Sequence, residues 1–139
     1  PGRQFASVHL EMAAEDDVIK SHDLIANIER AFLQNEHVNL IVHYDPIITG
    51  NEKINDLRCW LSEQIKTIDE GLSIHDLRVV PGETHTNLIF DCVMPHTLNM
   101  TESQLKTEIR KLVNAKYPNY YCVMTIDSSY AAMPHTKDD

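Results

Sequence analysis

Alternation of apolar and polar side chains is the first pattern along the chain. Over residues 4–12 the apolar set is Ala6, Val8, Leu10 and Met12, and the polar set is Ser7, His9 and Glu11. This two-residue period predicts a strand with one buried face. Similar patterns predict further strands over 38–45, 73–80, 87–94 and 120–127. The turn residues 81–83 predict that the third and fourth of these strands pair, and Pro46 is expected to end the second.

Three other segments place apolar residues at helical spacing. The first follows the acidic residues 15–17, which suit a helix N-terminus, and its stripe is Val18, Leu24, Ile25, Ile28, Phe32 and Leu33. The second covers residues 51–69. The third opens at Thr101 and Gln104, which fit a capping box, and is expected to stop at Tyr117. Residues 131–139 are polar and predict a flexible tail.

The element order is β-α-β, then α, then β-β-α-β, and its second half resembles the first. His9, Met12 and Asp45 fall on Asp91, Met94 and Asp127, each 82 positions later. The predicted fold is α+β, with two tandem ferredoxin-like halves over 1–48 and 49–130 whose sheets are covered by helices on one face. The first half lacks a counterpart of the strand over 73–80. We therefore expect the sequence to be a piece of a longer protein.

Composition narrows the range of functions. The chain has 139 residues, of which 42% are apolar, and it has no apolar run near the roughly 20 residues of a membrane helix. No signal peptide is recognisable, so this piece is expected to be soluble. Its formal net charge of -9 argues against a nucleic-acid partner and is compatible with cation binding, although most acidic domains are simply soluble.

Catalytic motifs and cysteine motifs are both missing from the sequence. There is no GxSxG, P-loop or GxGxxG, and the contiguous Ser21, His22 and Asp23 are not how a triad is built, so we expect no enzyme. A Cys–His catalytic pair stays open. The three cysteines, Cys59, Cys92 and Cys122, show no CxxC spacing and indicate reduced thiols in a cytoplasmic compartment. Cys92 and Cys122 sit in apolar strand patterns and are predicted to be core residues.

Metal ligands must converge on one space, and the strand patterns bring three candidates together. His43 and Asp45 are two positions apart, so they share the outer face of their strand, and His9 also points away from the core side of its own. If the two strands are neighbours, His9, His43 and Asp45 form a surface patch suited to zinc. The alternative is coincidence among eight histidines. His22 lies at the margin of a helix stripe and could reach the patch only round an edge or from a partner subunit.

The second half carries a parallel candidate site of His75, Asp91 and Asp127. The position that matches His43 is Thr125, so one imidazole of the first site has no counterpart. A decayed or weak copy is the favoured interpretation of this second site.

Several stretches together resemble the cytoplasmic domain of the cation diffusion facilitator family. They are FASVHLEM over 5–12, SHDLI over 21–25, IVHYDP over 41–46, and then LSIHDLRVV over 72–80 and the stretch 120–130, which resemble the extended C-terminal region of a bacterial branch. The resemblance covers about residues 1–130. It implies a ferredoxin-like domain that pairs with its twin, binds zinc at the pairing region and is linked to membrane helices that exchange divalent cations for protons.

The resemblance also implies which residues bind metal. The family's ligands fall on His9, His22, His43 and Asp45, with Asp45 as the bridge between ions. A further family histidine, on the missing opening strand, has no counterpart in the first half, while His75 takes the equivalent place in the second. The transport residues of the membrane bundle are absent.

The mechanism predicted on this basis is regulatory. Zn2+ or a similar divalent cation would offset repulsion between two acidic copies and favour a closer homodimer at the cytoplasmic face of the membrane. Nitrogen and oxygen ligands fit zinc best but do not exclude iron, manganese, cobalt or cadmium. The alternative is a ferredoxin-like module that dimerises without metal or binds a small ligand.

Overall fold

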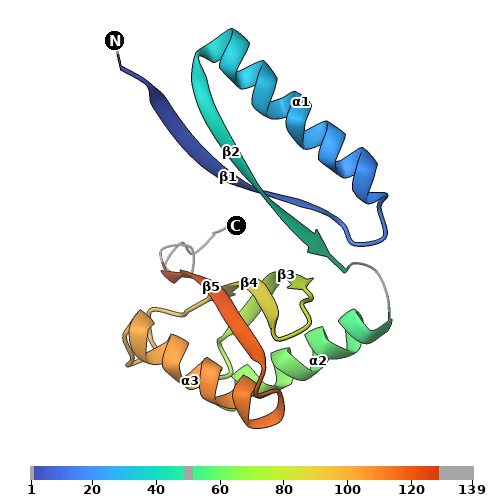
Figure 1. The fold of residues 1–139 in the computed structure, drawn as a ribbon. Helices are drawn as coiled ribbons and strands as arrows, with labels where there is room; N and C mark the ends of the chain where they lie inside the picture. Colours follow the sequence, from blue (N-terminus) through green and yellow to red (C-terminus); the bar gives the residue numbers. More distant parts are fainter. Residues whose placement is uncertain (1, 49–51, 129–139) are drawn as a thin grey trace, which may run out of the picture. The chain divides into compact units, whose positions relative to one another are not determined.

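The computed structural model describes residues 2–48 and 52–128, and over these the chain is α+β, with three helices and five strands in two small sheets (Figure 1). The chain divides into two compact units, Pro1–Ile47 (unit 1) and Ile48–Asp139 (unit 2). Within the described ranges, no helix has the length and apolar character needed to cross a membrane. The predicted tail, 131–139, lies outside the described residues.

Unit 1 is a single β-α-β element. Strands β1 (Gln4–Ala13) and β2 (Val38–Ile47) pair in parallel and are joined by helix α1 (Val18–Glu36). The acidic run before the helix supplies its N-cap, because the Asp17 side chain accepts a hydrogen bond from the Ile19 amide at 3.0 Å. At the other end His37 adopts a left-handed conformation (φ 56°) and donates its amide to the Phe32 carbonyl.

Strand β2 runs through Pro46 to Ile47, so the prediction that Pro46 ends the strand is wrong. The reason lies in the direction of the backbone amides. The amide of Val42 donates to the Glu29 carboxylate of α1 at 3.1 Å and therefore points away from β1. Amides alternate sides along a strand, so the nitrogen of Pro46 faces the same unpaired edge, where proline removes no hydrogen bond to β1.

Unit 2 contains two helices and a mixed three-stranded sheet. Its elements are α2 (Glu52–Lys66), β3 (Ser73–Val80), β4 (Thr86–Val93), α3 (Glu102–Lys116) and β5 (Tyr120–Asp127). The sheet order is β3-β4-β5, with β3 antiparallel and β5 parallel to β4. Helix α3 opens with the predicted capping box, in which the Thr101 and Gln104 side chains each accept a hydrogen bond from the other residue's amide.

The hydrophobic core belongs to unit 2. Helices α2 and α3 lie on the same side of the β3-β4-β5 sheet (Figure 1) and bury their apolar stripes against it. Among the described residues the buried apolar side chains are Ile54, Leu61, Ile65, Leu72, Leu77, Val79, Leu88, Phe90, Cys92, Met94, Leu105, Ile109, Val113, Cys122 and Met124. Cys92 and Cys122 are thus core residues, as their strand patterns predict.

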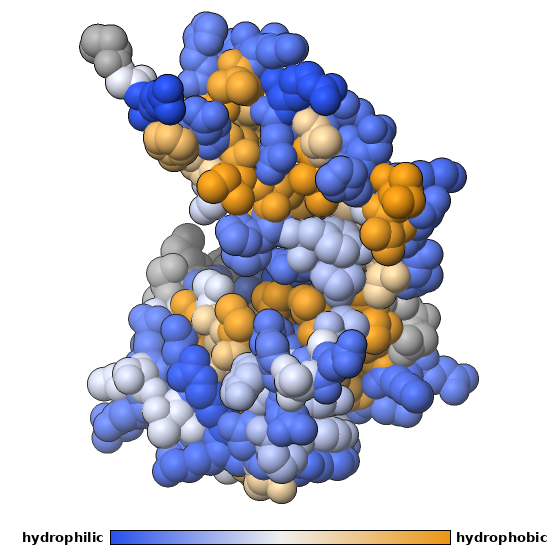
Figure 2. Space-filling view, in the orientation of Figure 1, coloured by the Kyte–Doolittle hydropathy of each residue, from blue (hydrophilic) through white to orange (hydrophobic). Residues whose placement is uncertain are grey.

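Unit 1 is much less buried. Of its described residues only Ser21 is buried, at 3% exposure, and no apolar side chain is. Its large apolar side chains that are exposed are Phe5, Val8, Val18, Ile19, Leu24, Phe32, Leu33 and Ile41. Figure 2 shows the corresponding orange, apolar surface over this unit. A β-α-β element alone therefore leaves apolar surface in water, which is unfavourable unless something covers it.

The internal repeat is visible in the strand register. The register pairs of β1 and β2 from Gln4↔Val38 to Glu11↔Asp45 each have a counterpart in β4 and β5 at positions 82 later, so that His9 opposite His43 corresponds to Asp91 opposite Thr125. Both parallel pairs are joined by a helix, α1 or α3. Unit 2 adds α2 and β3, for which the described part of unit 1 has no counterpart.

Candidate metal centre

His9 and His43 lie directly opposite each other on the two strands of unit 1. They are register partners in the β1–β2 pair, and their rings stack with centroids 5.0 Å apart and an interplanar angle of 23°. Directly opposed residues of neighbouring strands place their side chains on the same face of a sheet. The alternation of the sequence therefore leads to two exposed imidazoles side by side.

Asp45 completes a cluster that we call the β1–β2 patch, consisting of His9, His43 and Asp45. Its Oδ2 atom lies 2.9 Å from Nδ1 of His9, which donates to the carboxylate. Asp45 is 21% exposed in its side chain and His9 is 71% exposed. A carboxylate that accepts from Nδ1 fixes the tautomer of the imidazole and leaves Nε2 as the nitrogen with a lone pair for a metal ion.

The chemistry of the β1–β2 patch fits a divalent cation in part. Two imidazoles and a carboxylate are ligands that zinc prefers. Within residues 2–48 and 52–128, however, no group of three or more His, Cys, Asp or Glu side chains is already arranged as a metal site. The stacked rings and the His9–Asp45 hydrogen bond would have to rearrange for all three side chains to bind one ion. Asp45 in its present position instead orients His9, as a carboxylate behind a metal-binding histidine does.

A second carboxylate lies beside the patch. Glu11 is the register partner of Asp45, and it stands two residues after His9, so it shares the patch face of the sheet. Its half-buried side chain adds negative charge next to the two imidazoles, which favours a cation there. The candidate site residues proposed from sequence did not include Glu11, although its place in the alternation of β1 already put it on the outer face.

His22 is not part of the patch. It is exposed in the first half of α1, and no hydrogen bond, ion pair or ring contact joins it to His9, His43 or Asp45. A side chain on a helix reaches a neighbouring strand only if its face of the helix is turned towards that strand. The alternation of residues along the strands does not determine this rotation. The structure thus brings together three of the four ligands that the family resemblance implies.

The second candidate site lies on the sheet of unit 2. His75 of β3 and Asp91 of β4 are register partners. Asp127 of β5 is the register partner of Val93 of β4. These four residues line one open hollow of about 280 Å³. The hollow therefore gathers a histidine and two carboxylates, and His75 Nε2 also lies 3.4 Å from Ser73 Oγ. Thr125 takes the place that His43 has in the β1–β2 patch, so this hollow offers one imidazole instead of two.

Comparison of the chain with protein-family models, with curated proteins and with solved structures gives no match. Function is therefore inferred from the geometry of these sites and from the sequence pattern.

Proposed function

We propose that this chain is the cytoplasmic metal-sensing and dimerisation part of a divalent-cation/proton exporter of the cation diffusion facilitator type, with a role in regulation and not in catalysis. In this proposal units 1 and 2 are two ferredoxin-like halves, and the chain acts at the cytoplasmic face of the membrane through covalently linked membrane helices. The observation that carries the proposal is the convergence of His9, His43 and Asp45 on adjacent strands of unit 1.

The residues of the β1–β2 patch would hold a zinc-like cation in a simple division of roles. His43 and His9 offer imidazole nitrogens, and Asp45 either orients His9 or binds the ion itself. The three patch residues supply at most three ligands, so a tetrahedral ion keeps a position for Glu11, for water or for a residue of a second copy. An ion shared in this way links two copies of the chain.

Surface character supports dimerisation through the same face. Phe5 and Ile41 stand on the outer face of unit 1 together with the patch, and they are 67% and 54% exposed. Apolar side chains that surround polar anchors are typical of protein interfaces. The acidic charge of each copy, -9 for the whole chain, opposes association, and a bound cation reduces that repulsion. Metal would therefore shift the chain towards a homodimer by mass action.

Zinc titration by calorimetry, with sedimentation of the same samples, tests the proposal. The wild-type chain should bind zinc and sediment increasingly as a dimer when zinc is added. His43→Ala should weaken both effects by about tenfold or more, since it removes a direct ligand. His96→Ala, which removes an exposed histidine outside the patch, is the matched control and should behave as the wild type. Absence of zinc binding, or binding with no change in assembly, contradicts the proposal.

A second candidate function, a metal-independent dimerisation module, is favoured by the apolar surface of unit 1. Its eight exposed large apolar side chains would drive association without any ion. The double variant His43→Ala with Asp45→Asn separates the two candidates. A dimer that is unchanged in the variant, with or without zinc, supports the metal-independent module. A dimer that forms only in the wild type, and only with zinc, supports the sensor.

A further inference from the structure

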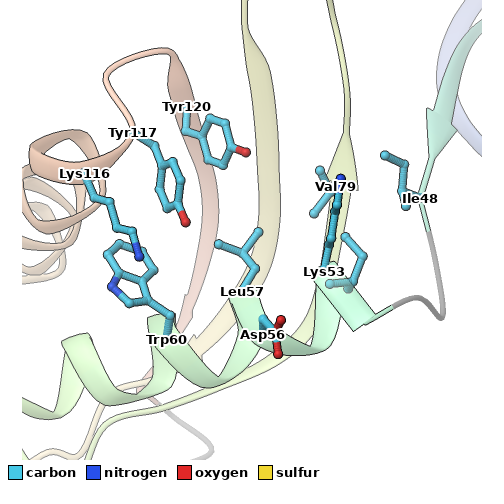
Figure 3. A pocket seen from close by; sticks show the side chains of 10 residues that line it. Ile48, Lys53, Asp56, Leu57, Trp60, Val79, Lys116, Tyr117 and Tyr120 are labelled. Atoms are coloured by element: carbon cyan, nitrogen blue, oxygen red, sulfur yellow. The ribbon is translucent and has the colours of Figure 1, made fainter.

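A hollow with aromatic walls lies within unit 2, and none of its lining residues belongs to either candidate metal site. Its volume is about 370 Å³, and the side chains that surround it come from α2, from β3, from Ile48 and from the end of α3 through the start of β5 (Figure 3). The residues that line it include Lys53, Asp56, Trp60, Lys116, Tyr117 and Tyr120. We call this space the aromatic hollow. Its size falls in the lower part of the range of about 300–1,000 Å³ that is usual for small-molecule sites.

Three aromatic rings form one wall of the aromatic hollow. Tyr117 stacks on Tyr120, with centroids 4.4 Å apart and planes 11° from parallel, and it meets Trp60 edge-on at 5.3 Å. In Figure 3 the ring of Tyr117 lies between the other two. The apolar base contains Ile54 and Val79, each 5% exposed. These surfaces suit the flat face of an aromatic ligand, because aromatic groups favour stacked and edge-on contacts.

The aromatic hollow has more basic than acidic side chains, whereas the chain as a whole is acidic. The whole sequence has 21 acidic residues against 12 lysines and arginines, yet the hollow is lined by Lys53 and Lys116 and by one carboxylate, Asp56. The Nζ atom of Lys116 is held 5.0 Å from the Trp60 ring centroid and 5.3 Å from that of Tyr117. Cation–π contacts of this kind position the ammonium group at the aromatic wall while its N–H groups can still donate to a ligand.

We propose that the aromatic hollow binds a small planar aromatic ligand that carries an anionic group, a carboxylate or a phosphate. The ring of the ligand packs against Trp60 and Tyr117 above the apolar base. The anionic group lies within reach of Lys116 and Lys53, whose charges would compensate it in a partly enclosed space. This site is separate from the metal sites, and its test does not depend on the proposed sensor function.

Trp60 offers a direct measurement, because it is the single tryptophan of the chain. The full chain is titrated with AMP and, separately, with 4-hydroxybenzoate, while tryptophan fluorescence is recorded. Calorimetry on the same samples gives an affinity that does not depend on the fluorophore. Adenosine and phenol serve as the uncharged counterparts of the two probes. We expect at least one anionic probe to change the fluorescence saturably and to bind more tightly than its uncharged counterpart.

Variants assign the binding to this hollow. Lys116→Ala should weaken the anionic probe by about tenfold, since it removes a charged hydrogen-bond donor, and Lys116→Arg should restore most of the affinity. Lys111→Ala is the matched control: it removes a lysine of the same helix that pairs with Glu108 and does not line the hollow. The proposal is overturned if neither anionic probe binds saturably, if the uncharged counterparts bind equally well, or if the two alanine variants lose the same affinity. Preference for AMP or for 4-hydroxybenzoate distinguishes a phosphate from a carboxylate ligand.

Discussion

The hydrogen bond between Asp45 and His9 determines how the β1–β2 patch presents its imidazole to a ligand. It joins two strands over 2.9 Å and selects the imidazole nitrogen that is left for a ligand. The pair lies at the surface, with His9 mostly exposed, and exposed ion pairs contribute only about 0–1 kcal/mol to folding. The interaction therefore contributes little to stability, and under the proposed function its role is to hold His9 for metal binding.

Replacing the carboxylate by its amide separates these roles. We expect Asp45→Asn to lower zinc affinity by about tenfold to a hundredfold, because the amide lacks the negative charge of the carboxylate that orients His9 or binds the ion. The free energy of unfolding in urea should change by less than about 1 kcal/mol. Asp23→Asn, which alters an exposed aspartate of α1 that accepts from Asn27, is the control and should leave both values unchanged. Equal zinc affinities for the two variants would exclude a role for Asp45.

The three cysteines should differ sharply in reactivity. Burial raises the pKa of Cys92 and Cys122 from 9.0 to about 11, whereas Cys59 is exposed. At pH 8 we therefore expect one thiol per chain to react rapidly with Ellman's reagent, and all three to react in urea, because the thiolate is the reactive form. Three fast thiols in the folded chain would contradict the core assignment.

The same pKa shifts have a consequence for stability. The pKa of Cys92 and Cys122 is higher in the folded chain than in the unfolded chain. The stability that this shift contributes is therefore fully present below pH 9.0. That contribution is lost as the pH rises from 9.0 towards about 11, because the unfolded chain releases its thiol protons first.

The residues of the β1–β2 patch could be predicted from sequence because strand alternation has a period of two. Once His9, His43 and Asp45 are assigned to strands, their common outward direction follows from the pleat. His22 shows the limit of this reasoning. Its side chain belongs to a helix, whose rotation and position over the sheet depend on packing that no local pattern specifies.

Among the elements, α3 has the most complete local signals. Thr101 and Gln104 form a reciprocal capping box, which satisfies two amides of the first turn. Thr101→Ala should lower the free energy of unfolding in urea by about 0.5–2 kcal/mol, because it leaves the Gln104 amide without its partner. Thr107→Ala is the matched control within the same helix: its hydroxyl donates to the Ser103 carbonyl, which already lies in the helix, so the change should be within about 0.5 kcal/mol. Equal effects of the two substitutions would show that the cap does not stabilise α3.

Most element boundaries followed from local patterns, and the exceptions have physical causes. Strand β5 begins and ends where the alternation predicts, whereas β2 passes through Pro46 because its amide edge there is unpaired. Strand β3 contains an irregularity between His75 and Arg78, where Asp76 has a positive φ of 56°. Neither a bulge nor the aromatic hollow has a periodic signal. The hollow combines residues of α2, β3 and the segment from the end of α3 to the start of β5, and such a combination appears only after folding.

At the scale of the whole molecule, burial divides the chain unequally. Every buried apolar side chain among the described residues belongs to unit 2, although unit 1 carries the β1–β2 patch. Burial of apolar surface is the main favourable term in folding, so unit 2 has far more to hold it together than unit 1. The sequence predicted the apolar stripe of α1 but not that four of its six side chains, Val18, Leu24, Phe32 and Leu33, would be exposed. The pattern shows which face of the helix is apolar but not whether another element covers it.

Hydrogen exchange read by mass spectrometry should therefore separate the two units. In dilute protein, amides of β1 and β2 should exchange much faster than those of β4, because few buried contacts oppose local opening in unit 1. Raising the protein concentration should slow exchange in β1 and β2, because association covers the exposed apolar surface of unit 1. It should leave β4 unchanged, because the apolar side chains of β4 that face the core are already buried in unit 2. Equal protection of both units at low concentration would contradict this expectation.

The internal repeat provides the control for this experiment. Ile41 and Val123 occupy matching positions on β2 and β5, and they are 54% and 53% exposed. Ile41→Ser should abolish the concentration-dependent protection of β1 and β2, because it removes an apolar side chain from the face that carries the β1–β2 patch. Val123→Ser removes a side chain of the same exposure from unit 2 and should leave that protection intact. If both substitutions, or neither, remove the protection, the outer face of unit 1 is not the surface through which the chain associates.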